Sequence, residues 1–110
     1  MAEEIKARFR RKGTTLTAKL LMPHPMEPGT RKETVLENGA ETERLIPAHY
    51  IETFTCKVNG RVVLDADMSG SVSTDPILTF YVDGVNAGDE VSVEWTDNKG
   101  ETMSRVDTIK

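Results

Sequence analysis

The sequence has one cysteine among its 110 residues. A single thiol excludes an internal disulfide framework. The chain also lacks any apolar run near the ~20 residues that a membrane-spanning helix needs. Its first residues, MAEEIKARF, contain no apolar stretch and so do not resemble a secretory signal peptide. Taken alone, these absences predict a cytoplasmic protein that does not insert into a membrane.

An excess of positive charge is also missing. The chain has 14 Lys and Arg residues against 18 Asp and Glu, a net charge of −4, which argues against a nucleic-acid-binding protein. Basic residues do gather in KARFRRK (residues 6–12), where they alternate with Ala7 and Phe9. That alternation predicts a strand whose basic side chains face solvent, and a patch for an anion or a partner is the alternative.

Patterns that mark known chemistry are absent as well. The sequence contains no glycine-rich phosphate loop, and no HxH, CxxC or HExxH spacing of metal ligands. The polar run DADMSGSVSTDP (residues 65–76) does not fit a calcium loop and reads as a connection between sheets. His24 and His49 are far apart in sequence, so we expect no metal site and no cofactor.

A catalytic pair of Cys56 with a histidine is conceivable. However, Cys56 shares a strand face with Phe54 and Val58, and apolar surroundings disfavour the reactive thiolate. We therefore expect Cys56 to pack in the core and the chain not to be an enzyme. A bond or contact between Cys56 and a partner chain is the alternative.

Apolar residues alternate with polar ones in seven short segments, and no segment reads as a long capped helix. Asn59-Gly60 is a strong hairpin signal, because a two-residue turn of this kind requires φ > 0 at both positions. DNKG (residues 97–100) predicts a second hairpin. The pattern predicts an all-β, immunoglobulin-like antiparallel β-sandwich of about seven strands, formed by one domain over residues 1–110. The residues expected between its sheets include Phe54, Leu78, Phe80, Val91, Val93 and Trp95; the face expected of the strand after Asn59-Gly60 is Val62, Leu64, Ala66 and Met68.

One region lacks this alternation of apolar and polar residues. Residues 23–47 hold four of the five prolines and show no sustained alternation. At about 25 residues the region is long for a connection in a compact domain, and such loops are often functional or mobile. Its middle part, residues 33–44, could form a small hairpin around Asn38-Gly39.

Both histidines belong to proline-containing segments of this kind. His24 lies between Pro23 and Pro25, and His49 follows Pro47. The prolines stiffen the segments, and the histidines could simply hydrogen-bond to the loop backbone. Recognition is the alternative, since a stiff exposed loop loses little entropy when it docks onto a partner.

The run HPMEPGTRK (residues 24–32), followed by LIPAHYI (residues 45–51), resembles the family of the Z subunit of SoxYZ, the bacterial sulfur-oxidation carrier complex. The resemblance continues in VNGRVVLDADMSGSVSTDP (residues 58–76) and in WTDNKGET (residues 95–102), so that it covers nearly the whole chain.

The resemblance implies an immunoglobulin-like scaffold subunit without catalytic activity. Its SoxY-like partner would carry the sulfur intermediates of thiosulfate oxidation on a cysteine in a C-terminal tail, and this chain, which ends RVDTIK, has no such tail. The heterodimer would work in the periplasm, and a subunit without its own signal peptide would be exported folded with its partner. That expectation replaces the cytoplasmic one.

The same resemblance makes the two motifs candidates for contact with the partner or, transiently, with other sulfur-oxidation enzymes. We expect no contact with nucleic acid or membrane. A free-standing immunoglobulin-like binding module without a carrier partner is the alternative function. The partner-contact candidates are His24, Pro25, Met26, Arg31, Lys32, Ile46, Pro47 and His49.

Overall fold

The computed structural model describes residues 3–110. Within these residues nine β-strands form, and no helix is long and apolar enough to cross a membrane. The strands are β1 (Lys6–Lys12), β2 (Thr15–Leu21), β3 (Lys32–Glu37), β4 (Ala40–Leu45), β5 (Ile51–Val58), β6 (Arg61–Asp67), β7 (Ile77–Asp83), β8 (Glu90–Asp97) and β9 (Thr102–Thr108).

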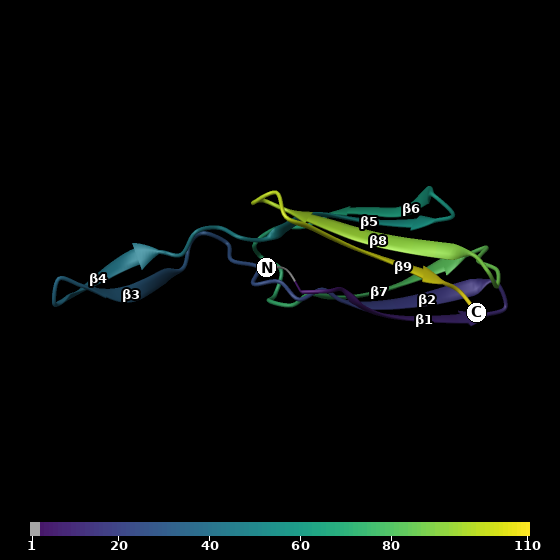
Figure 1. Cartoon of the computed structure of the whole chain (residues 1–110), viewed down its shortest axis with the longest axis horizontal. Helices are drawn as coiled ribbons and strands as arrows, with labels where there is room; N and C mark the ends of the chain where they lie inside the picture. The colour runs from purple at the N-terminus through teal and green to yellow at the C-terminus, as the bar shows by residue number, and fades with distance from the viewer. Residues whose placement is uncertain (1–2) are drawn as a thin grey trace.

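Seven of the strands form two sheets that face each other (Figure 1). One sheet has the order β1-β2-β7 and the other the order β6-β5-β8-β9, and all neighbouring strands are antiparallel. The predicted all-β, immunoglobulin-like antiparallel sandwich of about seven strands is therefore confirmed. The remaining strands, β3 and β4, pair only with each other, which brings the total to nine.

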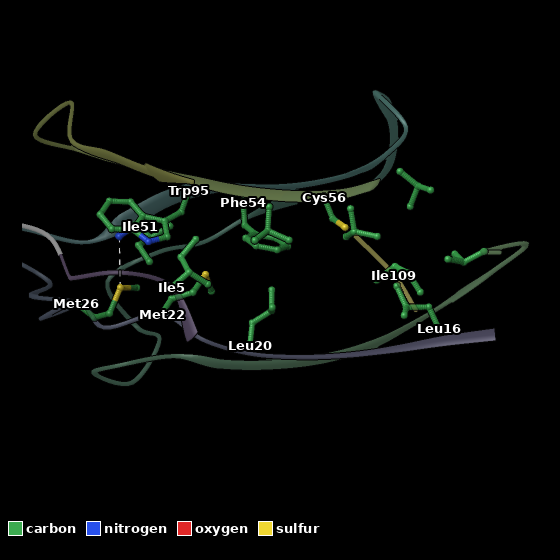
Figure 2. Packing of buried hydrophobic residues seen from close by; sticks show 14 residues of the cluster. Ile5, Leu16, Leu20, Met22, Met26, Ile51, Phe54, Cys56, Trp95 and Ile109 are labelled. Carbon is green, nitrogen blue, oxygen red and sulfur yellow. Dashed lines mark hydrogen bonds between the residues drawn. The ribbon is translucent and has the colours of Figure 1, made fainter. Parts of the chain in front are cut away.

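The core fills the space between the two sheets, as the period-2 alternation predicted. Figure 2 shows Trp95, Phe54 and Cys56 on one sheet opposite Met22, Leu20 and Leu16 on the other. Val91 and Val93 are buried as expected. The expectation for Leu78 and Phe80 was too strong, since both pack against the core but remain partly exposed. They belong to β7, which is an edge strand and is covered on fewer sides.

The prediction of which β6 side chains face the core was wrong for the first of them, Val62. Val62 is exposed, and Val63 packs against the core instead. The pairing of β5 with β6 shifts register between Cys56 and Lys57, so that Val63 is an extra residue opposite the β5 ladder. A bulge of this kind reverses the facing of the residues before it.

The predicted turns form. Asn59 and Gly60, between β5 and β6, have φ angles of 51° and 83°, and Asn38 and Gly39, between β3 and β4, have 50° and 76°. Both pairs occupy the left-handed region that a two-residue hairpin turn requires. DNKG likewise connects β8 to β9, with Gly100 at φ 83°.

The β3–β4 hairpin projects away from the sandwich, as Figure 1 shows at its left. The molecule is elongated as a result, with extents of 63 × 20 × 18 Å. Leu36 and Leu45 on this hairpin are 74% and 55% exposed. Isolated two-stranded hairpins are marginally stable in water, so the hairpin is a part of the chain that would gain from a partner.

Candidate functional site

The two histidine segments meet at one end of the sandwich. His24 follows β2 and prolongs its pairing with the chain before β7, because the His24 N–H donates to the Asp75 carboxylate (2.9 Å) and the Asp75 N–H donates to the His24 carbonyl (2.9 Å). This pairing turns the His24 side chain inward, and the residue is buried.

His49 reaches the same place from the chain before β5. Its backbone exchanges two hydrogen bonds with Glu27, at 2.6 and 2.8 Å. Asn98, in the β8–β9 turn, holds the neighbouring residues: its side chain accepts from the Tyr50 N–H (2.8 Å) and donates to the Ala48 carbonyl (2.9 Å). The histidine is therefore fixed by the loop on one side and by the turn on the other.

Asp97, the last residue of β8, joins the two histidines. One carboxylate oxygen, Oδ2, lies 3.0 Å from His24 Nε2 and 2.8 Å from His49 Nε2. The other, Oδ1, accepts the backbone N–H groups of Lys99 (3.0 Å) and Glu101 (2.8 Å). The Asp97 side chain is fully buried, yet both of its oxygens have hydrogen-bond donors.

The neighbour of the other ring nitrogen fixes the protonation of His24. Nδ1 lies 3.1 Å from the Met26 backbone nitrogen, whose N–H donates to it. Nδ1 must therefore be the unprotonated nitrogen, and Nε2 carries the proton that it donates to Asp97. His24 is thus a neutral Nε2–H imidazole in this arrangement.

These contacts also explain the ionisation state of the Asp97 carboxyl group. Burial by itself raises the pKa of a carboxyl group, because it disfavours the charged form. At Asp97 the hydrogen bonds from His24, Glu101, His49 and Lys99 together outweigh burial and lower the pKa below its ordinary value. The carboxylate is therefore ionised at neutral pH.

Within residues 3–110, one group of metal-ligating side chains is close enough to share an ion: His24, His49 and Asp97, whose ligand atoms lie within 4.8 Å of one another. A ligating histidine, however, binds through an unprotonated nitrogen and donates a proton from the other. His24 has the opposite arrangement, since its Nδ1 accepts the Met26 N–H. The donor set is thus satisfied as a hydrogen-bonded cluster, and the expectation of no metal remains a prediction.

A cavity of about 280 Å³ opens beside this cluster, lined by Glu3, Pro23, His24, Pro25, His49, Asp75 and Glu101. None of these lining residues is a serine, threonine or cysteine nucleophile. Cys56 pairs with Val93, whereas the Ile51–Asp97 pair closes the β5–β8 ladder. Five residues of strand separate Cys56 from that end, about 16 Å at 3.3 Å per residue. The conceivable Cys–His pair is therefore not formed.

The packing of the motifs explains why their glycines are needed. Gly29 has φ 85°, and a Cβ there would lie 3.0 Å from the Ala48 Cβ, which belongs to the other histidine motif. A Cβ on Gly70 would lie 2.6 Å from the Pro28 Cα. Three separate motifs of the sequence thus meet at one end of the molecule.

Met26 connects this end to the core. Its φ angle is 51°, in the left-handed region, which costs a non-glycine residue roughly 1–3 kcal/mol. The Ile51 N–H points at the Met26 sulfur, 3.3 Å away, as the dashed line in Figure 2 shows. The conformation is held by these contacts and by the Met26–His24 hydrogen bond.

The partner-contact candidates fall into two groups. His24 and Met26 are buried, so that their side chains could contact a partner only after a rearrangement, and this contact stays an untested prediction. Pro25, Arg31, Lys32 and Pro47 are exposed, and Ile46 and His49 are partly exposed; nothing yet tests their contact with a partner.

Arg31 and Ile46 lie at the base of the hairpin, where the Ile46 N–H donates to the Arg31 carbonyl (2.8 Å). The Arg31 guanidinium binds both carboxylate oxygens of Glu27, at 3.0 and 2.6 Å. Hydrogen bonding to Arg31 lowers the pKa of Glu27 below its ordinary value.

Sequence reasoning did not anticipate Asp97 as the link between the histidines, since DNKG was interpreted only as a turn. The alternation of core-facing and solvent-facing residues nevertheless indicated where Asp97 and His24 point. Asp97 continues the inward series Val91, Val93, Trp95, and His24 continues the inward series of β2 that ends at Met22. A carboxylate and an imidazole at core-facing positions require buried partners, and here they find each other.

Comparison with known proteins agrees with the motifs. A search of curated proteins found no match. A family model described as "Sulphur oxidation protein SoxZ" matches residues 5–107, which is nearly the whole chain. The match includes both histidine motifs, Asp97 and all nine strands up to the penultimate residue of β9. The chain therefore belongs to the SoxZ family of sulfur-oxidation proteins.

Proposed function

We propose that this chain is the non-catalytic scaffold subunit of a SoxYZ-type heterodimeric sulfur carrier in thiosulfate and sulfur oxidation. Its partner would be a SoxY-like subunit whose C-terminal cysteine carries the sulfur intermediates. Membership of the SoxZ family supports a role in sulfur oxidation and, in general, a complex with SoxY. The division of labour within that complex is the proposal.

The observation that carries the proposal is the position of Cys56. It is the one cysteine in the chain, it is 0% exposed, and its thiol is free. Burial raises its pKa to about 11, so that the thiolate is scarce at neutral pH. A sulfur carrier must present its thiol to the active sites of several enzymes, and a side chain in the middle of β5 cannot do so.

The same burial bears on the alternative of a disulfide with the partner. The Cys56 sulfur faces the core beside Phe54, as Figure 2 shows, and a partner thiol could reach it only if the sheets separated. We therefore propose that association with the carrier subunit is non-covalent at this residue.

We propose that the His24–Asp97–His49 cluster has a structural task within this scaffold. It ties the end of β2, the segment before β5 and the β8–β9 turn together through one buried carboxylate. These connections fix the base of the β3–β4 hairpin, because Glu27 and His49 are paired there. The hairpin can then be presented in a defined direction.

The β3–β4 hairpin is the region that we propose contacts the carrier subunit. It packs on neither sheet, and it exposes Leu36 and Leu45. Among the exposed candidates, Lys32 is the first residue of β3, and Arg31 and Pro47 flank the hairpin. A stable interface buries on the order of 1,200–2,000 Å² in total, so the partner would also cover part of the sandwich.

We further propose that the complex works in the periplasm and that this chain is exported together with its folded partner. The proposal rests on the sulfur-oxidation role of the family. Fractionation of cells with and without the partner gene tests it: the chain should reach the periplasm only when the partner is made.

Co-expression tests the assembly. The chain and a SoxY-like subunit should co-elute as one complex of one copy each at micromolar concentration, measured by size exclusion with mass determination. Replacing Leu36 and Leu45 with Ser should weaken the complex, whereas the matched control Val62→Ser, an exposed valine on the sandwich, should not. Separate elution of the unmodified chains would contradict the proposal.

A further inference from the structure

The outer face of the β1-β2-β7 sheet carries a charge opposite to that of the whole chain. Its outward residues include five cations, Lys6, Arg8, Arg10, Lys12 and Lys19, and one carboxylate, Asp83, a formal charge of +4. The complete chain has a net charge of −4. The predicted solvent-facing position is confirmed for four of the five KARFRRK cations, which are exposed, whereas Arg11 is only partly exposed.

None of these cations has an ion-pair partner among residues 3–110; the pairs that form involve Arg31, Arg44, Arg105 and the two histidines. Arg8 and Lys19 lie directly opposite each other in the β1–β2 register. Like charges in that position destabilise a sheet.

Apolar side chains lie on the same face. Tyr81 is 71% exposed and Ile77 is 63% exposed, and Leu21 pairs with Ile77 at one end. Exposed aromatic and aliphatic groups among arginines are typical of the side chains that protein interfaces use. A shallow hollow lined by Lys6, Arg8, Lys19, Leu21 and Ile77 lies at this end of the face.

We propose that this face, defined by the five cations with Leu21, Ile77 and Tyr81, is a docking site for the acidic surface of a transiently bound protein. Positive charge with exposed apolar groups is complementary to a negatively charged protein surface, and such complementarity raises the association rate and selects partners. The rest of the chain is negatively charged and would repel an extended polyanion, so a polyanion is disfavoured as the binding partner.

The size of the face indicates that the contact is transient. Three strands of seven residues present roughly 15 by 23 Å, about 350 Å². A standard stable interface covers about 800 Å² on each partner and is depleted in charge at its centre. The face thus differs in charge from the β3–β4 hairpin that we propose for the stable carrier subunit, whose strands carry four glutamates against Lys32 and Arg44. It does not depend on that proposal.

The test is an NMR titration of the ¹⁵N-labelled full chain with a peptide of alternating glutamate and tyrosine. Shift changes should map to β1, β2 and β7, and the affinity should fall roughly tenfold on raising salt from a Debye length of about 30 Å to about 8 Å. A peptide of alternating lysine and tyrosine is the matched probe and should not bind there. Absent changes, or changes on another face, would overturn the proposal.

Two variants separate the face from general charge effects. Combined Arg8→Gln, Arg10→Gln and Lys19→Gln should weaken peptide binding at least about tenfold, while thermal stability is unchanged or raised because the like-charge pair is gone. Combined Lys57→Gln, Arg61→Gln and Lys99→Gln removes the same charge from exposed positions elsewhere and should leave binding intact. Equal loss of binding in both variants would contradict a specific face.

Two further binding experiments test whether the face binds a polyanion or a membrane instead of a protein. Heparin serves as a polyanion, and vesicles of mixed neutral and anionic phospholipid serve as a membrane. Tighter binding of either one than of the acidic peptide would overturn the assignment to a protein. If the complex with a SoxY-like subunit no longer binds the peptide at this face, the face belongs to the stable interface and the proposal is wrong.

Discussion

Asp97 is the residue on which the buried histidine cluster depends. It accepts from both imidazoles through Oδ2 and from two backbone N–H groups through Oδ1. An asparagine has one acceptor and one NH₂ donor at these positions. In either orientation its NH₂ would face other donors, so that the hydrogen bonds on one side would be lost.

Asp97→Asn should therefore lower the free energy of unfolding by about 3 kcal/mol, as expected when one member of a buried charged network is removed. Denaturant titration followed by the fluorescence of Trp95, the sole tryptophan, measures it. Glu94→Gln, an exposed carboxylate on the same strand, is the control and should change stability by less than about 0.5 kcal/mol. Equal effects of the two variants would mean that the cluster contributes nothing specific.

The same residue makes stability depend on pH. The pKa of Asp97 is lower in the folded chain than its ordinary value of about 3.9. Its contribution is therefore complete above the ordinary pKa and is lost as the pH falls through the folded pKa. The stability difference between the wild type and Asp97→Asn should be constant near neutrality and should shrink below about pH 4. A stability difference that grows on acidification would show that folding does not lower the pKa of Asp97.

At the scale of elements, the histidine motifs are packing units. The loop after β2 and the loop after β6 touch where Gly70 meets Pro28, with no room for a Cβ. Backbone atoms form the obstacle, so neither loop can relax by a side-chain rotation. Gly70→Ala should thus destabilise the chain by about 1–3 kcal/mol, as overpacking does.

Thermal unfolding measures the effect of Gly70→Ala, and Ser73→Ala in the same loop serves as the control. Ser73 is exposed, and its replacement should have an effect within about 0.5 kcal/mol. A Gly70→Ala chain as stable as the control would refute the close approach of the two loops.

The seven strands of the sandwich could be predicted from the sequence because one face of each packs toward the core, which imposes period 2 on its side chains. The Asn59-Gly60 and Asn38-Gly39 turns could also be predicted, since few residues adopt φ > 0. The bulge at Val63 could not, because it reflects how β6 fits against β5 and leaves no local pattern. Its consequence was the reversed facing of Val62.

The candidate site was predicted only in part, for a similar reason. His24 and His49 were identified by their proline-containing segments, but their common partner Asp97 lies 48 residues from His49 along the chain. Which core-facing polar residues meet depends on the pairing of β5 with β8 and of β2 with β7, which is a property of the whole fold. Burial of His24 and Met26 followed from that pairing.

At the scale of the whole molecule, three features lie in different places. The β3–β4 hairpin projects at one end, and the lone thiol is enclosed between the sheets (Figures 1 and 2). The cationic face lies on the outside of the β1-β2-β7 sheet. The two outer features are suited to contact with proteins, and the enclosed thiol is not suited to carry cargo. The central claim is that this chain supports a sulfur carrier without bearing sulfur itself.

The most direct test is thiosulfate oxidation by the reconstituted pathway, with the complex assembled from the Cys56→Ala chain. Alanine is chosen because a serine hydroxyl would be buried in apolar surroundings without a partner. The account predicts activity within about twofold of wild type, less than a 0.5 kcal/mol change in barrier, with sulfur adducts found by mass spectrometry only on the partner's tail cysteine. Adducts on Cys56 in the wild-type complex, or activity lost while the variant complex still assembles, would contradict it.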